Sequence, residues 1–177
     1  MSATLTPEQV RELLEELAAR LDNAGVAAGI RVVGAAALSI LDRDGRSTAD
    51  VDAVIVPAGS AVGIVSAMAK EHGLPDDWLN DAALAYIPPV GPEDWTEVIR
   101  QGRVSVSIGS VQMLLAMKLL ANRGVRVSDD IAFLLDACRV TSIEDAQAIY
   151  QTYHAQDVLS AGATARVQQW LAKAQST

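Results

Sequence analysis

Residues 32–56 read VVGAAALSILDRDGRSTADVDAVIV, and the pattern of this stretch decides the fold class. Apolar segments at both ends flank a glycine, a run of small residues and a polar segment. The order predicts a strand, a glycine turn, a short helix, a loop and a second strand: residues 30–33, 34, 35–41, 42–47 and 49–56. Strands that alternate with helices predict an α/β fold, in which a sheet is flanked by helices.

The second predicted strand carries two carboxylates, Asp50 and Asp52, separated by one residue. Because side chains alternate across a strand, we expect both on one face, with Val51, Ala53 and Ile55 toward the core. Neighbouring carboxylates repel each other, and a divalent cation relieves the repulsion. Mg2+ binds a few protein oxygens together with substrate phosphates, so the pair predicts a metal site. For the pair alone, a solvated strand end with two surface acids is an equally good interpretation.

The turn at Gly34 and Ala35 lies between the first strand and the short helix. Backbone N–H groups at the N-terminus of a helix favour phosphate, and small residues let the backbone approach a ligand closely. An ordinary tight turn is the alternative interpretation of these two residues. The order of turn, helix, loop and Asp-x-Asp strand therefore carries more weight than the turn itself.

Composition limits the classes of function that the chain can serve. A formal net charge of -8 disfavours general nucleic-acid binding, because phosphate contacts depend on Lys and Arg. Aromatic residues make up 4% of the chain, which disfavours a base-stacking platform. Cys138 is the one cysteine and the two histidines are far apart, so we expect neither a disulfide nor a Cys/His metal cluster. The sequence shows no signal-peptide pattern and no long apolar run, so a cytoplasmic protein without membrane contact is expected.

The remaining sequence predicts an α/β part followed by a helical part. We expect residues 1–109 to form the α/β core and residues 110–177 a helical region that packs with it as one unit. Thr6 and Gln9 predict a capping box at the start of the first helix. Helices are expected over residues 60–72, 76–84, 93–101 and 163–174, strands over 86–87 and 103–108, and three helices with Ser110, Ser128 and Thr141 as caps. Glu144 would complete a capping box with Thr141.

The glycine turn and the Asp-x-Asp strand together resemble the nucleotidyltransferase superfamily of the DNA polymerase β type. In that superfamily a strand ends in Gly-Gly or Gly-Ser, a short helix follows, and the next strand carries Asp-x-Asp or Asp-x-Glu. Residues 46–52, RSTADVD, are similar to the Arg-x-Thr-x-Asp-x-Asp of one branch, the AbiEii-type toxins and their relatives. Residues 117–130 contain the later Lys and Arg helix and the Asp of that branch. The resemblance thus covers residues 30 to 135, and it implies a small mixed sheet flanked by helices.

The resemblance also implies a reaction: transfer of a nucleotide from a nucleoside triphosphate to an acceptor hydroxyl. Asp50 and Asp52 would hold Mg2+ or Mn2+, and the metal would bridge the phosphates. Gly34 and the amides after it would cradle the triphosphate. The implied nucleotide-binding residues are Gly34, Ala35, Arg46, Thr48, Lys118, Arg123 and Arg126.

A lysine and an aspartate in the helical part complete the implied catalytic set. Lys118 would meet the phosphates as a positive charge, and Asp130, or its neighbour Asp129, would orient Lys118 or the attacking group. Lys118 also interrupts an apolar run, and a lysine that extends along the helix surface is the alternative interpretation. In the toxin-like branch the acceptor is RNA or a protein side chain, and the partner is a cognate antitoxin.

Two departures from the superfamily pattern keep other functions open. Ala35 stands where other members have Gly or Ser, so a hydroxyl contact to phosphate is lost. The third carboxylate of other members is expected on a neighbouring strand, yet residues 103–108 offer Ser105 and Ser107 and no acid. Either Asp130 takes that role, or the chain is a catalytically impaired module that binds a nucleotide or a protein. A sugar- or antibiotic-modifying transferase would differ only in its acceptor, which a fold does not identify.

Overall fold

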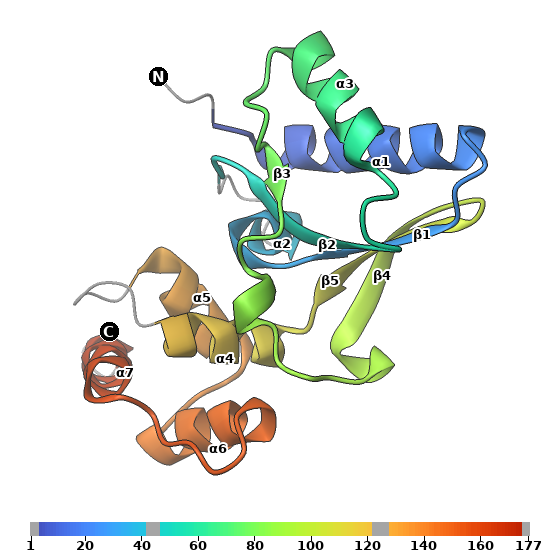
Figure 1. The fold of residues 1–177 in the computed structure, drawn as a ribbon. Coiled ribbons are helices and arrows are strands. Elements are labelled where there is room, and N and C mark those ends of the chain that lie inside the picture. The colour runs from blue at the N-terminus through green and yellow to red at the C-terminus, as the bar shows by residue number, and fades with distance from the viewer. Residues whose placement is uncertain (1–3, 42–46, 122–127, 175–177) are drawn as a thin grey trace. The chain divides into compact units, whose positions relative to one another are not determined.

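The computed structural model describes residues 4–41, 47–121 and 128–174, and these residues form a mixed sheet (Figure 1). Its strands lie in the order β3-β2-β1-β5-β4. Their bounds are Ala28–Val32 for β1, Val51–Val56 for β2, Leu79–Asn80 for β3, Trp95–Gln101 for β4 and Val104–Gly109 for β5. β1 pairs antiparallel with β2 and parallel with β5, β3 is parallel to β2, and β4 is antiparallel to β5. The predicted mixed α/β class is confirmed.

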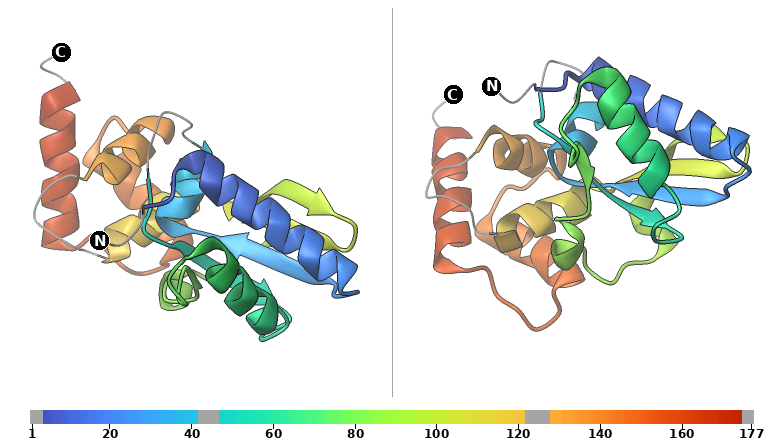
Figure 2. Two further views of the ribbon diagram at one scale, coloured as in Figure 1. Left: turned by 90° about the horizontal axis from the view of Figure 1, so that it is seen from above. Right: turned by 45° about the horizontal axis from the view of Figure 1, so that its top comes forward.

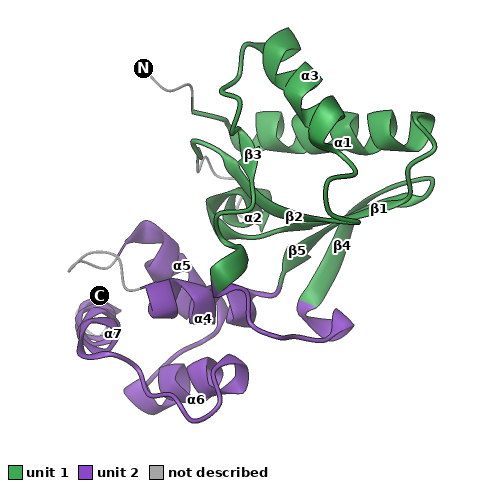
Figure 3. Cartoon of the chain, in the orientation of Figure 1, with its two compact units in different colours: residues 1–85, 95–109 green, residues 86–94, 110–177 purple. Residues whose placement is uncertain are grey.

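The described residues also form α-helices in both halves of the chain. Their bounds are Pro7–Asn23 for α1, Gly34–Leu41 for α2, Val62–His72 for α3, Val111–Ala121 for α4, Asp129–Ala137 for α5, Ile143–Tyr153 for α6 and Ala161–Ala174 for α7, with short 3-10 helices η1 at Leu84–Tyr86 and η2 at Pro92–Asp94. None of these helices has both the length and the apolar character that crossing a membrane requires. The chain divides into two compact units, residues 1–85 with 95–109 and residues 86–94 with 110–177 (Figure 3).

The first unit buries one face of its sheet beneath helices. α1 begins with the predicted capping box, in which Thr6 Oγ1 accepts the N–H of Gln9 at 3.2 Å and Gln9 Oε1 accepts the N–H of Thr6 at 2.9 Å. Its predicted apolar stripe is buried: Val10, Leu13, Leu14, Leu17 and Leu21. α1 and α3 lie on the same side of the sheet (Figure 2), where Ile30 and Val106 are fully buried. Each such apolar side chain contributes about 1.5–3 kcal/mol on burial, so the helices are held to this face by the hydrophobic effect.

The helix predicted over residues 93–101 is wrong, because this segment is strand β4. Trp95, Thr96, Val98 and Ile99 are aromatic or β-branched, and such residues favour a pleated, half-buried surface. The strand pairs with β5 through a tight hairpin in which Gly102 has a φ of 49°. A left-handed backbone at that position suits glycine, so the hairpin turn brings the two strands into register.

The elements predicted over residues 76–87 are also wrong. The expected helix over 76–84 is replaced by turns, the two-residue strand β3 and the start of η1, and the expected strand at 86–87 does not form. Trp78 explains the difference, because its side chain is fully buried and its indole N–H donates to the carbonyl of Val65 at 3.2 Å. This anchor holds the segment against α3, so that β3 pairs with β2 at residues 79 and 80.

Two serine caps of the second unit agree with the predictions. Ser110 Oγ accepts the N–H of Met113 at 3.2 Å at the start of α4. Ser128 Oγ accepts the N–H of Ile131 at 3.3 Å at the start of α5. Both hydroxyls satisfy an N–H group that a helix N-terminus leaves without an intrahelical partner.

The cap predicted for α6 is wrong by one residue. Ser142, not Thr141, is the N-cap, and its Oγ accepts the N–H of Asp145 at 3.1 Å. Thr141 instead donates its N–H and its hydroxyl to Asp145 Oδ2, each at 2.8 Å. Asp145 thus takes the place that the prediction gave to Glu144, because the helix begins one residue later than expected.

Candidate active site

Asp52 lies on the face of β2 that is opposite the helix-covered core. Its neighbours Val51 and Ala53 are buried, while Asp52 is partly exposed. The β2–β3 register pairs Asp52 with Asn80. Paired residues of adjacent strands point to the same side of the sheet, so the side chains of Asp52 and Asn80 share this face.

Asp50, immediately before β2, is fixed by hydrogen bonds to its side chain and its backbone. Asn80 Nδ2 donates to Asp50 Oδ2 at 2.9 Å, which places the Asp50 carboxylate on the same face as Asp52. Asn80 Oδ1 accepts the N–H of Ala82 at 3.0 Å, so the orientation of the Asn80 amide is set by both contacts. The hydroxyl of Thr48 is buried and donates to the carbonyl oxygen of Asp50 at 2.9 Å. Thr48, predicted as a nucleotide contact, therefore holds the backbone at the first carboxylate.

Gly34 lies directly against the Asp52 carboxylate, where α2 begins. A Cβ atom at Gly34 would overlap Asp52 Oδ2 and lie 3.3 Å from Asp52 Cγ. Gly34 also has a φ of 66°, a left-handed conformation that L side chains rarely adopt. The N–H of Val33 donates to the carbonyl of Asp52 at 2.9 Å, which joins the turn to β2. Both sterics and backbone conformation therefore require glycine here, and Ala35 follows within the first turn of α2.

Lys118 and Asp130 form an ion pair within the second unit. Lys118 Nζ lies 2.7 Å from Asp130 Oδ2, and both side chains are partly buried. Of the two acids considered for orienting Lys118, Asp130 makes this contact. The role of the pair in binding phosphate or moving a proton stays a prediction. The other predicted nucleotide contacts, Arg46, Arg123 and Arg126, lie outside the residues that the structure describes.

The two carboxylates suit a metal that completes its coordination with substrate oxygens. Asp50 and Asp52 offer hard oxygen ligands from one face, and Asn80 fixes the first of them. Mg2+ typically uses one or two protein carboxylates plus phosphate oxygens and water. Among the described residues, no group of three or more His, Cys, Asp or Glu side chains is placed to hold a metal ion. A carboxylate pair of this kind would thus hold Mg2+ or Mn2+ together with a bound phosphate.

Comparison with known proteins gives a structural likeness. No protein-family model and no curated protein matches this chain. The crystal structure of an antigenic nucleotidyltransferase-like protein from Paracoccidioides brasiliensis is similar over 93% of this chain and 96% of that chain, with a TM-score of 0.50 and 16% sequence identity. The chain has a nucleotidyltransferase-like fold. The likeness confirms the architecture expected from the superfamily, while the AbiEii-like branch stays a prediction.

In this nucleotidyltransferase-like fold, β5 presents hydroxyl groups on the face of Asp52. Val104, Val106 and Ile108 are buried, so Ser105 and Ser107 point to the opposite side of the sheet. Strand β5 is separated from β2 by β1. The two serines occupy the strand on which the superfamily resemblance implies a third carboxylate.

Strand β4 adds side chains to this face that the sequence interpretation missed. The register places Glu97 beside Ser107, and Trp95 lies two residues earlier on the same side. The guanidinium carbon of Arg31, on β1, lies 5.1 Å from the centroid of the Trp95 ring, within the range of a cation–π contact. Glu97 pairs with Arg100. The β-branched and aromatic content of residues 95–99 was the available signal for this strand.

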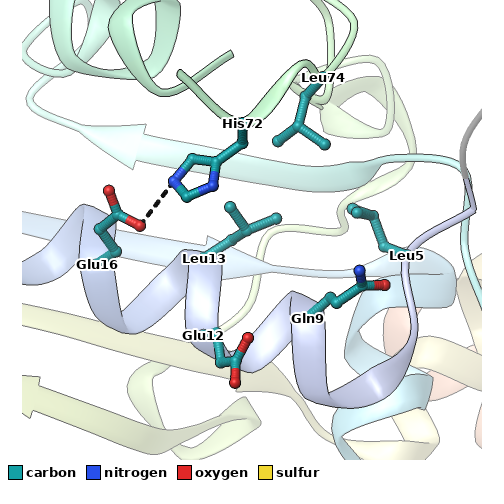
Figure 4. A pocket seen from close by; sticks show the side chains of 7 residues that line it. All are labelled: Leu5, Gln9, Glu12, Leu13, Glu16, His72 and Leu74. Carbon is teal, nitrogen blue, oxygen red and sulfur yellow. Dashed lines mark hydrogen bonds and ion pairs between the residues drawn. The ribbon is translucent and has the colours of Figure 1, made fainter. Parts of the chain in front are cut away.

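A small pocket elsewhere in the first unit contains none of the predicted site residues. It has a volume of about 200 Å³ and lies between α1 and the end of α3 (Figure 4). Leu5, Leu13 and Leu74 form its apolar part. At its rim, His72 Nε2 and Glu16 Oε2 are 2.8 Å apart, which ties α3 to α1. We interpret this pocket as part of the packing between two helices.

Proposed function

We propose that this chain is a Mg2+- or Mn2+-dependent nucleotidyltransferase that moves a nucleotide from a nucleoside triphosphate to an acceptor hydroxyl. One observation carries the proposal: Gly34, at the start of α2, is pressed against the carboxylate of Asp52, with Asp50 held on the same face. The N-terminus of a helix beside a pair of carboxylates provides both a phosphate-binding and a metal-binding element. The nucleotidyltransferase-like fold supports the same interpretation.

In the first unit, different residues would bind the metal and the phosphate. Asp50 and Asp52 would hold the metal, which neutralises charge on the transferred phosphate when bound. Asn80 keeps the Asp50 carboxylate in place through its 2.9 Å hydrogen bond. Gly34 leaves room for Asp52 and lets the amides at the start of α2 approach a phosphate group. In the second unit, Lys118 would bind the phosphates, and Asp130 would orient Lys118 or the attacking group.

A sequence motif and the charge of the chain indicate the acceptor and the partner. RSTADVD at residues 46–52 supports a toxin-like enzyme whose partner is a cognate antitoxin and whose acceptor is RNA or protein. A net charge of -8 disfavours a large RNA acceptor, because contacts with phosphates depend on positive side chains. A protein hydroxyl is therefore the favoured acceptor.

A labelling experiment tests the proposal. The purified chain is incubated with each α-labelled nucleoside triphosphate, Mg2+ and a cell lysate, and labelled RNA and protein are separated. We expect label on one macromolecule with wild type, none with Asp50→Asn or Asp52→Asn, and undiminished label with Asp157→Asn, a matched exposed acid between α6 and α7. Label that persists with both site variants would refute the assignment of the carboxylates.

A nucleotide-binding module without turnover is the second candidate function. Ser105 and Ser107 favour it, because they occupy the face of β5 where a third carboxylate was expected. The two candidates differ in one measurement. Metal-dependent binding of a nucleoside triphosphate without transfer to any acceptor would support the module, and transfer would support the enzyme.

A further inference from the structure

The outer edge of β2 is paired over only part of its length. β3 consists of Leu79 and Asn80, which pair with Val51 and Asp52. β2 continues to Val56, and in the described part of the chain no strand pairs with its last four residues on the side away from β1. The chain thus leaves the sheet after Asn80, and the edge of β2 from Ala53 to Val56 is left without a neighbouring strand among the described residues.

Backbone groups face this open position. The N–H of Val51 donates to the carbonyl of Trp78 at 2.7 Å, on the β3 side of β2. The carbonyl of Asp52 accepts from Val33 on the opposite, β1 side. Because backbone groups alternate along a strand, Ala53 and Ile55 present their N–H and C=O groups to the open side. An added strand at this position could therefore form backbone hydrogen bonds with Ala53 and Ile55.

An apolar pocket of about 390 Å³ lies along the same edge, entirely within the first unit. It is lined by side chains from β2, α3 and the segment after β3, among them Val54, Val62, Leu79 and Leu84. Val62 is 68% exposed and Leu84 is 51% exposed, and Val56 at the end of β2 is 53% exposed. Exposed apolar side chains that gather around a pocket mark a binding surface rather than an ordinary solvent-facing one.

We propose that this edge of β2 binds an extended peptide segment of a partner protein by strand addition. The aligned backbone groups of Ala53 and Ile55 would pair with the peptide backbone, and the pocket would take its alternate apolar side chains. Asp76 and Asp81 are exposed and line the pocket, so the favoured peptide carries Lys or Arg beside its apolar residues. Asn80 also lines this pocket and contacts Asp50, so the peptide lies next to the carboxylate pair. This inference does not require that the chain transfers nucleotides.

The test selects displayed random peptides of about ten residues on the wild-type chain, a length close to that of a long strand. A synthetic copy of an enriched peptide is then titrated against wild type and variants. We expect sequences that alternate apolar and polar residues and contain Lys or Arg. Val62→Asp should weaken binding about tenfold or more, because it brings a charge to an apolar pocket. Val158→Asp is the matched control, since Val158 is 73% exposed in the second unit, and it should bind as wild type.

Backbone pairing is tested separately from the pocket. Ile55→Pro removes an N–H that faces the open side while leaving the β1 ladder, and N-methylation of alternate peptide amides removes the complementary groups. Both changes should abolish binding.

Val62→Asp is compatible with folding, because residue 62 lies in the first turn of α3, where acidic side chains are favourable. Failure to enrich any peptide, equal binding to Val62→Asp, or self-association of the chain through this edge would overturn the proposal.

Discussion

Gly34→Ala is the substitution whose effect follows most directly from the geometry of the carboxylate site. The new Cβ would overlap Asp52 Oδ2, and the φ of 66° would hold an alanine in the left-handed region. The backbone term costs about 1–2 kcal/mol, and turning the Asp52 side chain away from a staggered position costs about 0.5–1.5 kcal/mol more. We therefore expect the free energy of unfolding to fall by about 1.5–3.5 kcal/mol.

Substitutions at two other glycines separate the cost of the left-handed backbone from the cost of displacing Asp52. Gly73 has a φ of 62° and nothing within 4 Å of an added Cβ, so Gly73→Ala carries only the backbone term. Gly63 is helical with nothing within 4 Å, so Gly63→Ala should stabilise the chain by about 0.5–1 kcal/mol. Urea denaturation followed by circular dichroism measures all three variants.

A measurement of nucleotide binding tests whether the contact between Gly34 and Asp52 matters for function. Displacing Asp52 should weaken metal-dependent binding of a nucleoside triphosphate about tenfold or more, as loss of a group that positions a ligand does. Gly73→Ala should bind as wild type. The reasoning fails if Gly34→Ala is no less stable than Gly73→Ala, or if it binds nucleotide with unchanged affinity in calorimetry.

Three further predictions concern other parts of the chain. Asn80→Ala should weaken metal-dependent nucleotide binding about tenfold, because the Asp50 carboxylate loses its 2.9 Å hydrogen bond, and unchanged affinity in calorimetry would contradict this. Ser142→Ala should lower the free energy of unfolding by about 1 kcal/mol through loss of the α6 cap, as measured by urea denaturation. Burial raises the pKa of the Cys138 thiol from 9.0 to about 11, so the unfolded chain loses this proton first and stability should fall as the pH rises from 9.0 to about 11. Cys138→Ala should remove that part of the pH dependence, and a thiol reagent should react slowly with native protein at neutral pH.

The parts of the fold that were predictable carry their signals in neighbouring residues. Thr6 and Gln9 lie three residues apart and cap α1 as expected. Asp50 and Asp52 are separated by one residue, which predicted both on one face of a strand over residues 49–56. Strand β2 begins at Val51, so Asp50 lies immediately before it. Gly34 was recognisable as a turn, although its close approach to Asp52 required the folded backbone.

The parts that were not predictable depend on contacts between distant segments. β4 contains Glu97, Arg100 and Gln101, which suit a helix, and it becomes a strand because β5 supplies a partner through the hairpin. β3 is two residues long and exists because Trp78 is anchored against α3. Asn80 lies 30 residues from Asp50 along the chain and belongs to no motif, so its hydrogen bond to the carboxylate had no sequence signal.

The central claim is that Asp50 and Asp52 together hold a metal that binds a nucleoside triphosphate. Mn2+ binding, followed by electron paramagnetic resonance with and without a nucleoside triphosphate, tests it most directly. The account predicts that wild type binds Mn2+ more tightly when the nucleotide is present, that Asp50→Asn and Asp52→Asn lose this coupling, and that Asp157→Asn, which changes an exposed acid between α6 and α7, retains it. Nucleotide-dependent Mn2+ binding that survives both site substitutions, or is absent from wild type, would contradict the account.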